Sequence, residues 1–137
     1  MTERTLVLLK PDAVRRGLVG EIIGRYETKG LSIVTMEWRH IDGAFADRHY
    51  AEHVEKDFYP PLRDFVCSGP IVAMVLEGDA AVDVVRVLNG ATDGRKADPG
   101  SIRGDLSLSN RENLVHGSDS AESAKREIAL WFPELLG

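Results

Sequence analysis

His116 stands in the stretch "NLVHGSDSAES", directly before a glycine and a run of small polar residues. A histidine can do chemistry there, because a neutral imidazole offers a free lone pair near pH 7. As a nucleophile it would form a covalent intermediate and divide one transfer into two easier steps. The local pattern also fits a purely structural role. Gly117 allows a sharp turn, Asp119 can cap a helix, and Glu122 follows three residues later, as in a capping box.

Cationic and polar side chains elsewhere in the chain could complete a phosphoryl-transfer site around this histidine. Lys10 follows the first apolar run, Arg86 lies on a predicted helix, and Arg103 lies in a long polar stretch. Arginine and lysine neutralise phosphate oxygens, while hydroxyl and amide groups can hold the sugar. Thr92 and Asn113 are the candidates for that second task. Each residue alone is more commonly an ordinary surface residue, but together they supply what phosphoryl transfer needs.

Other common nucleotide and metal motifs are absent from the sequence. It has no G-x-x-x-x-G-K-[ST] loop, no G-x-G-x-x-G turn after a strand, and no H-R-D or D-F-G set. The segment "HYAEH" places His49 and His53 four residues apart on a predicted helix, a spacing that two zinc ligands would use. Glu52 is not where a metalloprotease has its acid, and no third ligand is evident. An ordinary solvated helix is therefore the favoured interpretation.

The composition predicts one domain over residues 1–137, without repeats or linkers. A net charge of −5 offers no basic surface, so no specific nucleic-acid partner is expected. Cys67 is the single cysteine, which excludes an internal disulfide and suggests a buried thiol on a helix face. No apolar stretch approaches the ~20 residues of a membrane helix, and no signal peptide is evident. We therefore expect a cytoplasmic protein.

The hydrophobic pattern predicts four strands. Continuous apolar runs over 4–9 and 71–78 are typical of strands buried on both sides. Residues 31–40 alternate instead, with Val34, Met36 and Trp38 on one face, and predict a half-buried strand. A short fourth strand is expected over 113–116.

Helical spacing predicts five helices, over 19–30, 43–53, 59–69, 79–90 and 120–132. Residues 91–112 have no pattern and predict a long, functional loop. The order contains the β-α-β-β-α-β arrangement of a ferredoxin-like sandwich. The expected fold is therefore α+β, a four-stranded antiparallel sheet with helices packed on one face.

Several segments resemble nucleoside diphosphate kinases, in the same order and over essentially the whole chain. They are "TLVLLKPDAVRRGLVGEII", "HYAEH", "SGPIVAMVLEG", "PGSIRGDL" and "NLVHGSDSAESAKREIALWF". The N-x-x-H-G-S-D element is the most specific of them. The resemblance implies that the γ-phosphate of a nucleoside triphosphate, mainly ATP, passes to nucleoside diphosphates through a ping-pong mechanism. His116 matches the residue that is transiently phosphorylated, and the activity would maintain nucleoside triphosphate pools.

The resemblance also implies a role for each matching residue. The positions that would bind phosphates are Lys10, Arg86, Thr92 and Arg103, with Lys10 also reaching the sugar. Asn113 would contact the ribose, Phe58 would stack on the base, and Leu62 would form a nearby apolar wall. The positions that would support the histidine or its surroundings are Tyr50, Ser118 and Glu127. Because every base has a face to stack, broad base specificity is expected.

The implied cofactor is Mg²⁺, carried by the nucleotide's phosphates rather than held directly by protein ligands. The implied assembly is a homo-oligomer, with a hexamer favoured and a tetramer possible. The chain departs from the family pattern at Asp57, Tyr59 and Asn110, and at Asp93-Gly94, where Asn-Pro is usual. Since glycine frees a chain that proline would stiffen, a looser loop and a less stable assembly are expected.

Two other functions compete with this one. A ferredoxin-like module could bind a nucleotide as a regulator without turning it over, since a fold does not fix a function. A nucleic-acid-binding protein is the weaker alternative, given the acidic charge. The complete set of His116, Lys10, Arg86, Arg103 and Asn113 argues against the regulator, because a degenerate copy would have lost some of these residues.

Overall fold

Four antiparallel strands form one sheet in the order β2-β3-β1-β4. The computed structural model describes residues 2–136, and its strands are β1 (Thr2–Leu9), β2 (Ser32–Arg39), β3 (Ile71–Asp79) and β4 (Val115–Gly117). The central pair, β1 and β3, is in register over its whole length, from Thr2 opposite Asp79 to Leu9 opposite Val72. This sheet, with its connecting helices, confirms the predicted α+β ferredoxin-like class.

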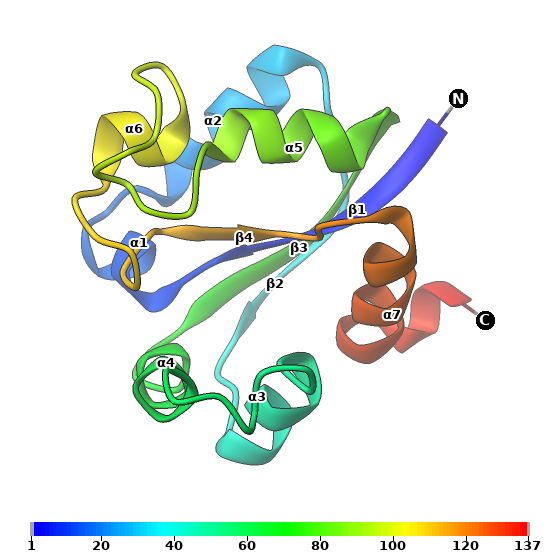
Figure 1. Ribbon diagram of the computed structural model, residues 1–137. Helices are drawn as coiled ribbons and strands as arrows, with labels where there is room; N and C mark the ends of the chain where they lie inside the picture. Colours follow the sequence, from blue (N-terminus) through cyan, green and yellow to red (C-terminus); the bar gives the residue numbers. More distant parts are fainter. Residues whose placement is uncertain (1, 137) are drawn as a thin grey trace.

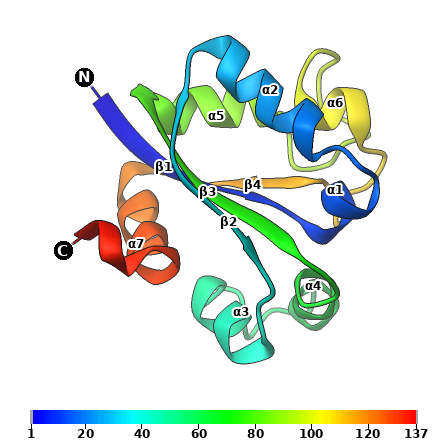
Figure 2. The same cartoon turned by 180° about the vertical axis from the view of Figure 1, so that it is seen from behind.

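Helices cover both faces of the sheet, so the predicted single-faced arrangement is wrong (Figures 1 and 2). On one face, Val7 and Leu9 of β1 pack against α2 (Val19–Lys29) and α5 (Ala81–Asn89). On the other, Leu6 and Leu8 pack toward α3 (Gly43–His49), α4 (Tyr59–Val66) and α7 (Ala121–Trp131). Strands that are apolar on both sides need apolar cover on both sides. The continuous apolar runs therefore already pointed to two helical layers.

Three short elements were not predicted: α1 (Pro11–Arg15), α6 (Ile102–Leu106) and the 3₁₀ turn η1 (Pro133–Leu136). The stretch 91–112 is thus not an unbroken loop, because α6 lies inside it, with Ser101 as its N-cap accepting from the Gly104 N–H. The cap of α7 is Ser120, which accepts from the Ser123 N–H, and not Asp119 as expected. Helical elements of only four or five residues leave too little periodic signal to detect.

The edge strand β2 contains an irregularity that changes which residues share a face. Its register with β3 shifts between Ile33 and Thr35, so Val34 is an extra residue, as in a β-bulge. Val34 packs on the α3, α4 and α7 side. Met36 and Trp38 pair with Met74 and Val72, whose side chains face α2 and α5. The prediction that Val34 shares a face with Met36 and Trp38 is therefore wrong.

Helix α3 ends at His49, so the segment "HYAEH" is not one continuous helix. His53 lies in the following turns, and the four-residue spacing with His49 has no helical meaning. Cys67 is half-buried just past the end of α4, not on its buried face. None of the helices within residues 2–136 is long and apolar enough to cross a membrane.

Candidate active site

A pocket of about 880 Å³ opens beside β4 and gathers nine of the eleven residues singled out in the sequence. These are Lys10, Tyr50, Phe58, Leu62, Arg86, Thr92, Arg103, Asn113 and His116. They lie just after β1, in the α3–α4 connection, on α4, α5, α6 and β4, and in the segments on either side of α6. Positions spread over more than a hundred residues of sequence thus meet at one concave surface. Ser118 and Glu127 lie behind His116 rather than on the wall of this pocket.

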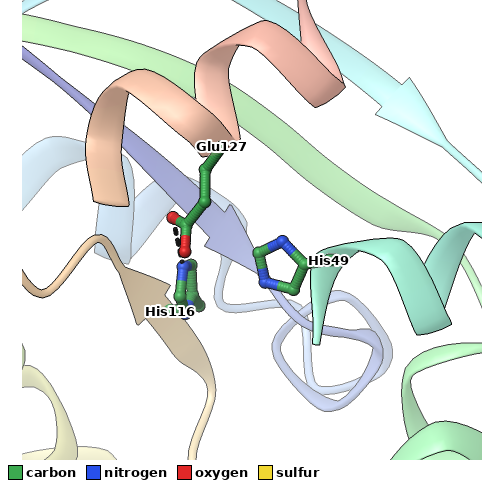
Figure 3. Close-up of side chains that lie close together, drawn as sticks. All are labelled: His49, His116 and Glu127. Carbon is green, nitrogen blue, oxygen red and sulfur yellow. Dashed lines mark hydrogen bonds and ion pairs between the residues drawn. The ribbon is translucent and has the colours of Figure 1, made fainter. Parts of the chain in front are cut away.

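His116 occupies the middle of β4, opposite Leu8 of β1, and its side chain is 20% exposed. Its Nε2 atom lies 2.9 Å from Oε1 of Glu127, which projects from α7 (Figure 3). An ionised carboxylate only accepts hydrogen bonds, so this contact assigns the proton of the neutral imidazole to Nε2. Nδ1 then carries the lone pair.

Glu127 is buried and receives two hydrogen bonds on the same oxygen. Besides the His116 contact, the Ser118 hydroxyl donates to Oε1 at 2.7 Å. Burial is the largest single effect and raises the pKa of Glu127, but the effects of His116, His49 and Ser118 together outweigh it and lower the pKa overall. Arg126, 3.7 Å from the other oxygen, adds a positive charge nearby. The carboxylate therefore stays ionised and fixes both the position and the tautomer of His116.

His49 also adjoins this group, although the sequence pattern gave it no role there. Its ring packs edge-on against His116, with 4.8 Å between ring centroids (Figure 3). The Trp131 indole N–H donates to Nδ1 of His49 at 3.0 Å, and burial lowers the pKa of His49 to about 3. His49 is thus neutral with its proton on Nε2. Only the fold reveals this contact, since no spacing links His49 to His116.

The ligand atoms of His49, His116 and Glu127 lie within 4.8 Å of one another, the one such three-residue cluster found among the described residues. A metal there would need lone pairs from both imidazoles. Nδ1 of His49 already accepts from Trp131, and Nε2 of His116 faces Glu127. The chemistry of the cluster therefore fits a hydrogen-bonded nucleophile better than a metal centre.

Lys10 and Asn113 form a buried polar pair on the pocket wall. The Lys10 ammonium donates to Oδ1 of Asn113 at 2.9 Å. The amide nitrogen of Asn113 donates to the backbone carbonyls of Thr92 and Asn110. Burial, assisted by the charge of Arg103, lowers the pKa of Lys10 to about 8. Asn113 therefore links the backbone of Thr92 and Asn110 to the Lys10 ammonium.

The two arginines of the pocket differ in how they are held. Arg103 is 9% exposed, and its guanidinium donates to the carbonyls of Asn113 (3.1 Å), Gly90 (2.8 Å) and Val115 (2.6 Å). Two of its five N–H donors remain for a ligand. Arg86, in the last turn of α5, is exposed and makes no side-chain hydrogen bond within residues 2–136. Arg103 therefore joins β4 to the neighbouring loop, while Arg86 is free to turn toward a ligand.

Phe58 lines the pocket directly before α4, with half of its surface exposed. The ring of His53 lies 5.5 Å from it, and the Lys56 ammonium lies 5.9 Å from its centroid. The Tyr59 departure is accommodated locally, since its hydroxyl donates to Asp47 at 2.7 Å. Phe58 itself keeps half of its surface exposed at the pocket.

The Asp93-Gly94 departure is accompanied by specific contacts within its loop. The Gly94 N–H donates to the Ser109 carbonyl at 3.1 Å, and Asp93 pairs with Arg95 at 2.8 Å. A Cβ atom at Gly94 would lie 2.4 Å from the Ser107 carbonyl oxygen. Glycine is required here because two backbone segments approach closely.

Comparisons with known proteins agree with the geometry. A family model described as "Nucleoside diphosphate kinase" matches residues 3–135. A nucleoside diphosphate kinase of Nocardioides sp. is 77% identical over 135 residues, covering 98% of this chain and all of the relative. One from Cutibacterium acnes is 61% identical, covering 98% and 97% of the two chains.

A solved structure has a very similar fold. The nucleoside diphosphate kinase of Halobacterium salinarum, determined in complex with CDP, is 50% identical and superposes with a TM-score of 0.94. The match covers 96% of this chain and 88% of that one. The chain therefore belongs to the nucleoside diphosphate kinase family, enzymes that transfer phosphate between nucleotides.

Proposed function

We propose that the transfer proceeds in two steps through a phosphohistidine on His116, from a nucleoside triphosphate to a nucleoside diphosphate. The observation that supports this most strongly is the contact between His116 Nε2 and Glu127 at 2.9 Å. It leaves Nδ1 as the nucleophile on the wall of a cationic pocket. In the first step Nδ1 bonds to the γ-phosphorus while the bond to the bridging oxygen breaks, and the nucleoside diphosphate leaves. In the second, a phosphate oxygen of another nucleoside diphosphate attacks, and the P–N bond breaks.

Glu127 matters in both steps because the imidazole becomes positively charged when Nδ1 is phosphorylated. A buried carboxylate facing the Nε2 proton stabilises that charge where it develops. Lys10, Arg86 and Arg103 would neutralise the phosphate oxygens, and each charged hydrogen bond contributes ~1.5–3 kcal/mol. Phe58 would stack on the base and Leu62 would flank it, which supports broad specificity, mainly with ATP as donor. Tyr50, Thr92 and Asn113 would complete the walls.

Mg²⁺ is the proposed cofactor, carried by the nucleotide. A bound Mg²⁺ neutralises phosphate charge and aligns the phosphates for in-line transfer. Asp119 is the one carboxylate among the residues lining the pocket, beside Lys10, Arg86, Arg95, Arg103 and Arg111. A single carboxylate fits contact with a water of the ion, and it is too little for a protein cage of oxygen ligands.

A labelling experiment tests the covalent step. The protein is incubated with Mg²⁺ and γ-labelled ATP, isolated, and then given GDP. We expect an acid-labile label on the wild type that passes to GDP, and none on His116→Ala. His40→Ala is the matched control, because His40 is exposed and lies outside the pocket. Labelling of His116→Ala, or nucleotide binding by the wild type without any label, would instead favour the regulator.

We also propose that the chain is a single domain that acts in the cytoplasm as a homo-oligomer, a hexamer rather than a tetramer. The support for assembly is the open edge strand β2, where Met36 is 49% and Trp38 63% exposed. Apolar side chains on a free strand edge favour pairing with another chain. Trp38→Glu should lower the mass found by sedimentation. Val87→Glu, at an apolar site 76% exposed on α5, should not; the reverse result would contradict the assignment of the interface to β2.

A further inference from the structure

Asp12 is a buried acid beside the site to which neither the sequence nor the proposed mechanism gives a role. It lies in the first turn of α1, two residues after Lys10, and is 3% exposed. One carboxylate oxygen, Oδ2, accepts the backbone N–H of Leu114 at 3.1 Å. The other, Oδ1, is buried without a hydrogen-bond partner in the described part of the chain. A buried carboxylate is costly to retain unless it is paired.

Leu114, the partner of Asp12, has an unusual backbone. Its φ is +73°, a left-handed conformation that residues other than glycine rarely adopt. It is fully buried and lies between Asn113 and β4. Its N–H bonds to Asp12, and its carbonyl accepts the Lys10 N–H at 2.8 Å. The N–H and the carbonyl of Leu114 are thus both hydrogen-bonded to residues at the turn from β1 into α1.

Asp12 interacts with two positive charges in the part of the chain that the structure describes. Lys10 and Arg103 are buried cations, and within residues 2–136 their side-chain hydrogen bonds go to an amide and to backbone carbonyls, not to a carboxylate. The carboxylate of Asp12 raises the pKa of both, against burial, which lowers each of them. Among the described residues, it is the only acid that acts appreciably on Lys10.

We propose that Asp12 is a positioning residue: it holds Leu114 in the left-handed turn that places Asn113 and His116, and it is the counter-charge of Lys10 and Arg103. This inference rests on the proposed function of the pocket, and it adds a second support for His116 besides Glu127. This short turn sets the distance between Asn113, which would hold the ribose, and His116, the proposed nucleophile.

The charge of Asp12 has a consequence for the pH dependence. Lys10 faces Arg103 from α6, Asp12 from α1, the neutral Asn113 before β4, and His49 of α3, whose pKa lies far below neutrality. Phosphate binding needs protonated Lys10, so kcat/KM of the free enzyme should fall as pH rises through about 8. Without the negative charge of Asp12, Lys10 loses its proton more easily. That fall should then begin at lower pH.

Two substitutions separate the two roles. Asp12→Asn keeps an oxygen that can accept the Leu114 N–H but removes the charge. It should raise KM roughly tenfold, with kcat little changed, and shift the alkaline fall of kcat/KM to lower pH. Asp12→Ala also removes the acceptor, so His116 shifts and kcat should fall roughly 100-fold. The matched control is Asp83→Asn, an exposed acid in the first turn of α5, which should leave all three quantities unchanged.

The outcomes are decisive even if a variant is less stable. Unfolding curves identify the pH range in which each variant is folded, and calorimetry with ADP measures binding without turnover. An alkaline fall at the same pH in folded Asp12→Asn and wild type, with equal ADP affinity, would overturn the counter-charge role. Equal kcat for folded Asp12→Ala and Asp12→Asn would overturn the role at Leu114. If the wild type forms no phosphohistidine, the proposed mechanism fails, while ADP binding still tests Asp12.

Discussion

Two regions of the site are built in opposite ways: a rigid end around His116, with Glu127 and Ser118, and an open end around Phe58. At the His116 end, the imidazole, Glu127 and Ser118 are joined by hydrogen bonds of 2.9 and 2.7 Å on elements that are part of the core. At the other end, Phe58 stands between a turn and a short helix, with half of its surface in solvent. At the rigid end, which would do the chemistry, the polar side chains are hydrogen-bonded to one another. At the open end, the ring that would stack on the base is exposed to solvent.

This difference follows from what each end has to accomplish. A nucleophile must approach phosphorus in line, so small displacements are costly and its partners must be fixed before the substrate arrives. A base of any identity must be accepted, and an exposed aromatic face is indifferent to the pattern of hydrogen-bonding groups. Substitutions at the rigid end should therefore act on kcat, and substitutions at the open end on KM.

The largest effect should come from Glu127→Ala. Without the carboxylate, the tautomer of His116 is no longer fixed and the charge of the phosphohistidine is uncompensated, so kcat should fall roughly 100-fold or more. Glu127→Gln keeps an acceptor oxygen without the charge and should lose less. Rapid-quench labelling of His116 measures the first step directly.

Stability provides a check on that prediction. Removing Glu127 leaves the buried Ser118 hydroxyl and His116 without their acceptor, which should cost about 1–3 kcal/mol. Glu122→Ala, an exposed glutamate on the same helix, is the matched control and should change neither rate nor stability appreciably. A Glu127→Ala variant that folds and labels at the wild-type rate would show that the rigid end is not what drives the chemistry.

The sequence predicted the fold where the pattern was long and regular, and it failed where tertiary context decided. The apolar runs of β1 and β3 located the sheet, and they also called for the second helical layer that was not predicted. The extra residue Val34 reversed the face of Met36 and Trp38, because a strand pattern has a period of two. The alternating sequence pattern does not reveal where a bulge inserts the extra residue.

The candidate site shows the same division. Residues with distinctive chemistry, such as Lys10 and Arg103, were found from the sequence and do line one pocket. His49 and Asp12 were missed because their importance depends on partners far along the chain. Trp131 lies 82 residues after His49, and Leu114 lies 102 residues after Asp12. A buried histidine or aspartate looks the same in sequence as an exposed one.

The smallest effect should come from Phe58→Ala at the open end. Stacking contributes ~1–3 kcal/mol per base, so KM should rise on the order of tenfold, and by a similar factor for adenine, guanine, cytosine and uracil nucleotides. Because Phe58 makes no hydrogen bond or ring contact with His116 or Glu127 within residues 2–136, kcat should stay near the wild-type value. Phe58→Trp preserves a stacking face and should restore the affinity. A loss confined to one base would mean that the open end reads base edges, and a loss in kcat would mean that the two ends are coupled.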